Sequence, residues 1–123
     1  LSKYRLDKIF YYSGGYMDEA SVTSAQWLSK HIDLNVTRLC SDVFSRYTAL
    51  RSYGRIYEGY VSLLSNSTII PLNSVVYLSQ LNVIYGQIVG EYFIWNIGEL
   101  DSLLIGENKI YTNGGSEAYA SVP

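Results

Sequence analysis

The feature that most constrains this chain of 123 residues is an apolar repeat with helical spacing between about Val22 and Tyr53. Its apolar positions are three or four residues apart throughout: Ala25, Leu28, Ile32, Val36, Leu39, Val43, Tyr47 and Leu50. At the rotation of an α-helix they stay within an arc of about 100°, the width of one apolar stripe. Asp18, Glu19 and Ser21 just before the repeat are typical of a helix start. No proline interrupts the stretch, so the repeat predicts one long amphipathic helix.

The next two segments also favour helices. Tyr53-Gly54 weakens the long helix, and residues 55–65 continue as a second helical piece. Residues 75–97 form the most apolar part of the chain. Because apolar side chains surround them almost completely, they predict a buried helix. Their many β-branched side chains leave a strand as the alternative.

The last part of the chain contains one helix signal and one turn signal. Glu99 and Asp101 are typical of a helix start and precede a short helix expected over residues 100–105. Asn113-Gly114-Gly115 is a turn signal for a hairpin. Because Gly, Ser and Ala are frequent there, a flexible or extended tail is slightly favoured.

The predicted fold is therefore all-α, a helical bundle with a long N-terminal helix and an extended or hairpin-like C-terminal tail. A chain of this length is expected to form a single domain. Its parts would be an N-terminal arm over residues 1–21, the bundle over residues 22–106 and the tail over residues 107–123.

Basic side chains are confined almost entirely to the first 55 residues. Eight of the nine lie there: Lys3, Arg5, Lys8, Lys30, Arg38, Arg46, Arg51 and Arg55. Residues 1–55 carry these eight against five acidic side chains, a net charge of +3, whereas residues 56–123 carry one against six, a net charge of −5. Such asymmetry is typical of contact with a nucleic acid or another charged surface on one side only.

The predicted long helix would place most of these charges on its outer side. Lys30, Arg38, Arg51 and Arg55 fall opposite the apolar stripe, and Arg46 falls at its edge. Arg and Lys bind phosphate without sequence preference. The chain also has 13 tyrosines and only 16% charged residues, and a surface of that kind favours contacts with other protein chains.

The sequence offers no convincing catalytic set. It contains one cysteine, Cys40, and one histidine, His31. Nine positions apart, they would lie on opposite sides of a continuous helix, which argues against a nucleophile–base pair. Cys40 is expected to be a small buried residue and His31 a polar surface residue. Glycine-rich phosphate loops and zinc-ligand spacings are absent from the sequence, so no enzyme activity, metal or cofactor is expected.

The segment Gly54-Arg55-Ile56-Tyr57-Glu58-Gly59-Tyr60 resembles the IYQGF-type segment in the major coat proteins of rod-shaped and filamentous archaeal viruses, the rudiviruses and lipothrixviruses. The order that follows is similar as well. A helix runs to about Ser65, a linker precedes a long apolar helix with tyrosines, and a short Leu-rich helix ends at Gly106 before a tail of small residues. The resemblance covers residues 54–123.

The resemblance implies a structural virion coat protein that polymerises into a helical shell around double-stranded DNA in the A-form. It implies that basic residues face the DNA, namely Lys30, Arg38, Arg46, Arg51 and Arg55, with Lys3, Arg5 and Lys8 as an arm. The implied partners are the chain itself or a paralogous coat protein, double-stranded DNA and an envelope surface, with no small-molecule substrate. The chain departs from the family in being net acidic, at −2, which a paralogous partner would accommodate.

Two other functions are consistent with the sequence alone. One is a pilus-like surface filament subunit that binds no nucleic acid. The other is a small helical protein that binds or regulates a protein partner. The sequence has no uninterrupted apolar run of about 18 residues, so no membrane span is expected.

Overall fold

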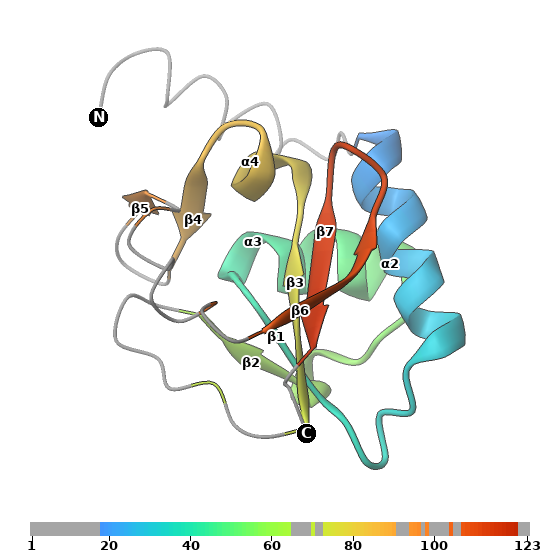
Figure 1. Cartoon of the computed structure of the whole chain (residues 1–123). Coiled ribbons are helices and arrows are strands. Elements are labelled where there is room, and N and C mark those ends of the chain that lie inside the picture. The colour runs from blue at the N-terminus through green and yellow to red at the C-terminus, as the bar shows by residue number, and fades with distance from the viewer. Residues whose placement is uncertain are drawn as a thin grey trace.

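The computed structural model of the chain describes residues 18–64, 70, 73–90, 94–96, 98, 104 and 107–120. These residues form both helices and strands (Figure 1). In chain order they are α2 (Glu19–His31), β1 (Arg38–Ser41), α3 (Val43–Ser45), η1 (Arg46–Tyr53), η2 (Glu58–Tyr60), β2 (Val61–Leu63), β3 (Ser74–Leu78), α4 (Gln80–Val83), β4 (Gln87–Val89), β5 (Ile94–Asn96), β6 (Asn108–Thr112) and β7 (Glu117–Ala120). Helix η1 is a π-helix and η2 is a 3₁₀-helix.

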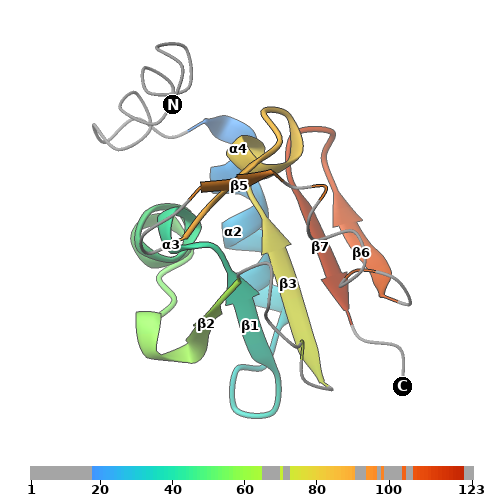
Figure 2. The same cartoon turned by 90° about the vertical axis from the view of Figure 1, so that its left-hand side faces the viewer.

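A mixed five-stranded sheet forms the centre of the molecule (Figure 2). Its strand order is β2-β1-β3-β7-β6, with β1 parallel to both of its neighbours and β7 antiparallel to both of its own. Strands β4 and β5 form a separate antiparallel pair. The prediction of an all-α helical bundle is therefore wrong.

The predicted long helix over residues 22–53 is replaced by a helix, a strand and a second helix. Asp18 caps α2 by accepting the N–H of Ser21 at 2.7 Å, so the expected helix start is confirmed. The helix ends at His31, and the Asp33 carbonyl then accepts the N–H of Thr37 at 2.9 Å to close a turn. Strand β1 follows the turn. Spacings of three and four residues are shared by one helix and by two helices interrupted by a strand, so the repeat alone did not reveal the break.

The apolar segment over residues 75–97 is not a long helix either. Its first part is β3, in which every residue is buried. A strand covered on both faces reads as a continuous apolar run, which is the same pattern that a buried helix gives. The rest of the segment contains α4 and the β4–β5 pair.

Two other expected elements differ from the prediction. In place of the helix expected over residues 55–65, the structure has the short 3₁₀-helix η2 followed by strand β2. The C-terminal residues form the β6–β7 hairpin, so the slightly favoured flexible tail is wrong and the hairpin alternative is observed. Gly114 has a φ of 86° in the turn, a conformation that favours glycine. Since β7 pairs with β3, this hairpin is part of the sheet rather than an appendage. Of the helix expected over residues 100–105, only position 104 is described.

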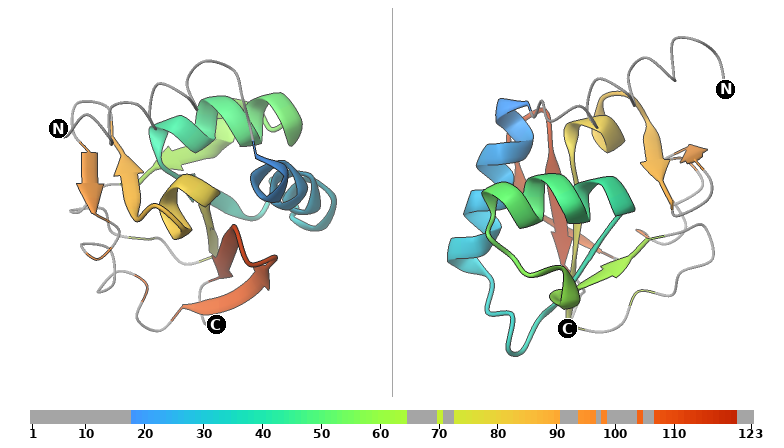
Figure 3. Two further views of the ribbon diagram at one scale, coloured as in Figure 1. Left: turned by 90° about the horizontal axis from the view of Figure 1, so that it is seen from above. Right: turned by 180° about the vertical axis from the view of Figure 1, so that it is seen from behind.

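Both faces of the sheet are covered. Helix α2 and the continuous α3–η1 helix lie on one face (Figure 3), above a core that includes Leu28, Leu39, Leu50, Tyr77 and Ala118. The opposite face carries a second core of Cys40, Leu64, Val76, Leu78 and Ile88. Neighbouring residues of β1 and β3 alternate between these two cores, as the pleat of a strand requires.

Asp42 connects three elements at the carboxyl end of β1. Its side chain is fully buried, and Oδ1 accepts the N–H of Ser45 at 2.8 Å, which caps α3. Oδ2 accepts two hydrogen bonds, one from Nδ2 of Asn82 at 2.8 Å and one from the N–H of Val89 at 3.0 Å. Because Asn82 belongs to α4 and Val89 to β4, one carboxylate fixes the start of the helix against the chain that follows β3.

Tyr77 joins β3 to α2 through its hydroxyl group. The hydroxyl donates to the Ser21 carbonyl at 2.8 Å and lies 2.9 Å from Oγ of Ser24. Burial raises the pKa of Tyr77 well above its ordinary value of about 10. The contacts with Ser24 and Ser21 lower the pKa but offset only part of that rise.

Replacing Asp42 should test the role of the buried carboxylate in stability. Asp42→Ala removes the acceptor of two buried donors, from Ser45 and Asn82, and of the part-buried N–H of Val89, and we expect the free energy of unfolding to fall by about 3 kcal/mol. Asp33→Ala is the matched control, because the exposed Asp33 side chain accepts one backbone N–H, that of Asn35. It should cost less than about 1 kcal/mol. Urea denaturation measures both, and equal losses would contradict the assignment.

Replacing Tyr77 by Phe should change how stability depends on pH. The variant keeps the ring but loses the hydroxyl contacts, so it should be about 1 kcal/mol less stable at neutral pH. The raised pKa keeps Tyr77 protonated in the folded state, so its stabilising contribution is complete below pH about 10 and is lost as the pH rises above it. The parent should therefore lose more stability than Tyr77→Phe between pH about 9 and about 11. If the urea midpoints of the two proteins fell by the same amount over this pH range, the predicted role of the Tyr77 hydroxyl would be contradicted.

Candidate nucleic-acid interface

The α3–η1 helix and the residues directly after it form the most basic acid-free segment of the described chain. Residues 43–57 contain three arginines and three tyrosines and no Asp or Glu. The helix packs its inner side on the sheet through Ala49 and Leu50, which are both fully buried. Its outward side carries Arg46, Tyr47, Arg51 and Tyr53, and Arg55 follows two residues after the helix ends. We name these five residues the arginine–tyrosine face.

The side chains of this face are accessible in the described structure. Arg51 and Arg55 are exposed, and Tyr47 and Tyr53 keep 43% and 40% of their surface exposed. Arg46 is half-buried, and its guanidinium carbon lies 5.4 Å from the centre of the Tyr47 ring. A π-helix bonds residues five apart, so Arg46 and Arg51 occupy neighbouring turns.

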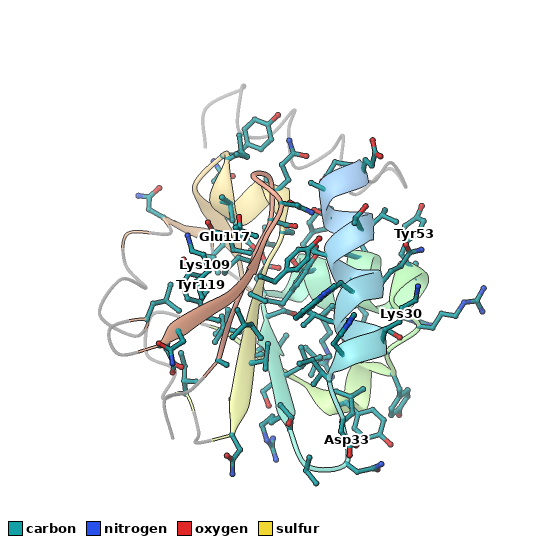
Figure 4. The ribbon with its side chains drawn as sticks, turned by 45° about the vertical axis from the view of Figure 1, so that its right-hand side comes forward. Lys30, Asp33, Tyr53, Lys109, Glu117 and Tyr119 are labelled. Atoms are coloured by element: carbon teal, nitrogen blue, oxygen red, sulfur yellow. The ribbon has the colours of Figure 1, made fainter. Side chains whose placement is uncertain are left out.

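Lys30 extends the arginine–tyrosine face onto helix α2. Figure 4 shows Lys30 and Tyr53 on the same side of the molecule, from the two neighbouring helices. The helices approach closely at Gly54, where an added Cβ would lie 3.1 Å from the carbonyl oxygen of Ala25 and 2.8 Å from that of Leu50. This close approach fixes the end of η1 against α2, and it explains why a glycine stands there.

The structure separates the other predicted nucleic-acid residues into two groups. Arg38 is exposed at the start of β1, and its guanidinium donates to Oγ of Ser62 at 3.1 Å. It therefore lies on a strand of the sheet and not on the outer side of a long helix. Lys3, Arg5 and Lys8 lie outside the described residues.

A cleft beside Arg38 contains residues that the sequence reasoning missed. It has a volume of about 230 Å³. The turn after α2 and the η2 segment line it: Leu34, Asn35, Val36, Thr37, Arg38, Gly59 and Tyr60. We call it the Arg38–Tyr60 cleft. Tyr60 is 49% exposed and meets the 69%-exposed Tyr57 edge to face, with ring centres 6.1 Å apart. The abundance of tyrosine in an acid-poor segment was the only sequence signal for it.

Trp27 of α2 lies apart from the arginine–tyrosine face. It is half-buried, with its ring centre 4.5 Å from that of His31 and 4.7 Å from that of Tyr111. Because Tyr111 belongs to β6, Trp27 packs α2 against that strand.

The remaining reactive side chains lie apart from one another. Cys40 is fully buried on the sheet face opposite α2, and burial raises the pKa of its thiol. His31 is exposed at the end of α2, with Nδ1 2.8 Å from the Trp27 carbonyl oxygen. Across the described part of the chain, no group of three His, Cys, Asp or Glu side chains is placed to hold a metal ion. Within that same part, no helix is long and apolar enough to cross a membrane.

The basic residue of the C-terminal half lies away from this interface. Lys109 of β6 donates to Oε2 of Glu117 at 2.9 Å, and the Tyr119 hydroxyl donates to Oε1 of the same carboxylate at 2.8 Å. Figure 4 shows this trio on the hairpin, far across the view from Lys30 and Tyr53. Lys109 is thus a positive charge already paired with an acid, outside the arginine–tyrosine face.

Comparisons with known proteins gave no match. No protein-family model matches the chain, no curated protein matches it, and no solved structure matches it. The coat-protein resemblance stays a prediction from residues 54–123, and the all-α fold that it implied is wrong.

Proposed function

We propose that this chain is a non-catalytic nucleic-acid-binding protein that contacts the phosphate backbone through the arginine–tyrosine face. The observation that carries the proposal is the accumulation of arginines and partly exposed tyrosines on the α3–η1 helix and just after it, with no acidic residue between positions 43 and 57. Guanidinium groups bind phosphate oxygens, and tyrosine rings supply contact area for sugars or bases.

The net charge of −2 does not oppose this proposal. Fields from charges separated by more than about 10 Å are largely screened at physiological salt, so a ligand at the face senses mainly the local charges. The helix supplies Arg46 and Arg51, Arg55 follows just after it, and Lys30 of α2 lies on the same side of the molecule as Tyr53. A locally positive face on an acidic protein thus attracts a polyanion on one side only.

The other parts of the earlier expectation stay predictions. Polymerisation with itself or a paralogue, an envelope contact and a place in the virion come from the resemblance, and the described residues do not test them. The same is true of a surface filament without nucleic acid and of a regulator with a protein partner.

Salt dependence of binding tests the proposed function. We expect a short labelled DNA to bind with a dissociation constant of about 10⁻⁶ to 10⁻⁴ M near physiological salt, and more tightly at lower salt. Arg51→Gln and Arg55→Gln should each reduce the slope of log affinity against log salt concentration by about 0.9, the effect of one phosphate contact. Fluorescence anisotropy over a salt series gives both quantities.

Lys109→Gln is the matched control, because it removes one positive charge from outside the arginine–tyrosine face. It should leave the affinity and the slope unchanged. Binding that does not depend on salt would contradict the proposal, and so would equal effects of the Lys109 and Arg51 substitutions.

A further inference from the structure

We infer that the Arg38–Tyr60 cleft receives one unpaired nucleotide, so that the chain prefers single-stranded nucleic acid to duplex. This inference rests on the proposed function and names the form of nucleic acid that the same surface would take. It differs from the double-stranded DNA that the coat-protein resemblance implies.

The chemistry of the cleft suits a nucleotide. Arg38 supplies a guanidinium for phosphate, and its bond to Ser62 Oγ at 3.1 Å orients it. Asn35 and Thr37 supply polar side chains in the same lining. The Tyr60 ring offers an aromatic surface, and its edge-to-face contact with Tyr57 limits how the ring can turn. Basic groups and aromatic rings together are the set that single-strand-binding surfaces combine.

The size of the cleft limits what it admits. Its volume of about 230 Å³ is below the roughly 300–1,000 Å³ of most small-molecule pockets. A single base or sugar-phosphate unit is therefore a better occupant than a larger ligand. A base inside a duplex must first leave the stack, which costs a few kcal/mol, whereas a base in a single strand is already accessible. The cleft therefore favours the single strand.

The cleft is continuous with the arginine–tyrosine face along the chain. Helix η1 ends at Tyr53, and Tyr60 follows seven residues later, a distance of at most about 25 Å even for a fully extended chain. Arg55 and Tyr57, both exposed, lie between them. One strand of about seven nucleotides, at roughly 3.4 Å each, spans that distance. A bound strand can thus contact the arginines with its phosphates while one base enters the cleft.

Two acidic residues stand near the cleft along the chain, Asp33 and Glu58. Asp33 is exposed in the turn, its Oδ1 accepts the N–H of Asn35 at 3.0 Å, and it is not among the residues that line the cleft. Glu58 stands directly before Gly59 in η2. Three basic residues of the same segments oppose these two acids: Lys30 in the last turn of α2, Arg38 and Arg55.

The test compares a labelled single strand with the duplex of the same sequence. The parent protein should bind the single strand about 5- to 100-fold more tightly, as expected for one stacked base. Tyr60→Ala should remove most of that preference by weakening single-strand binding and leave duplex binding unchanged. Tyr60→Phe keeps the ring and should retain the preference. Arg38→Gln should weaken single-strand binding more than duplex binding.

Tyr85→Ala is the control for loss of a partly exposed tyrosine, since Tyr85 is 37% exposed between α4 and β4. It should change neither affinity. Equal affinity of the parent for both forms, or an equal loss of both in Tyr60→Ala, would overturn the inference while the salt dependence at Arg51 still supports the proposed function. No binding to either form would overturn both.

Discussion

The buried carboxylate of Asp42 is the interaction on which the described architecture depends most. Burying a carboxylate costs free energy unless its oxygens accept hydrogen bonds. Here Ser45, Asn82 and Val89 donate hydrogen bonds to the Asp42 oxygens. These partners come from the helix after β1, from α4 and from β4. The position of the α3–η1 helix is therefore coupled to α4 and β4, the two elements that follow β3 in the chain.

Once the start of that helix is fixed at Asp42, its end is fixed by the close approach at Gly54 to Ala25 of α2. Ala49 and Leu50 then face the sheet, and the arginines and tyrosines are left outside. The basic surface is thus a consequence of helix packing: the same helix closes one core and presents an acid-free outer side. Arg46 and Arg51 are therefore on the outer side of the helix because its other side packs on the sheet.

The Arg38–Tyr60 cleft has a different origin. Arg38 begins β1 and Tyr60 ends η2, and they meet because β1 and β2 are parallel neighbours, with Leu39 opposite Val61. A parallel pair needs a crossover connection, and the arginine-bearing helix is that connection. The arginine–tyrosine face and the Arg38–Tyr60 cleft therefore belong to one strand–helix–strand unit, which holds arginine side chains and an exposed tyrosine ring in one continuous segment of the chain.

The sequence by itself determined the local features: the start of α2 at Asp18, the turn at Asn113-Gly114-Gly115, the burial of Cys40 and the confinement of basic charge to residues 1–55. Each depends on neighbouring residues or on composition. The sheet was decided only by tertiary structure, because apolar spacings of three and four did not distinguish one helix from helices around β1, and β3 is buried on both faces. Long-range strand pairing leaves no local pattern in the sequence. The sequence alone therefore did not predict that Arg38 and Tyr60 line the same cleft.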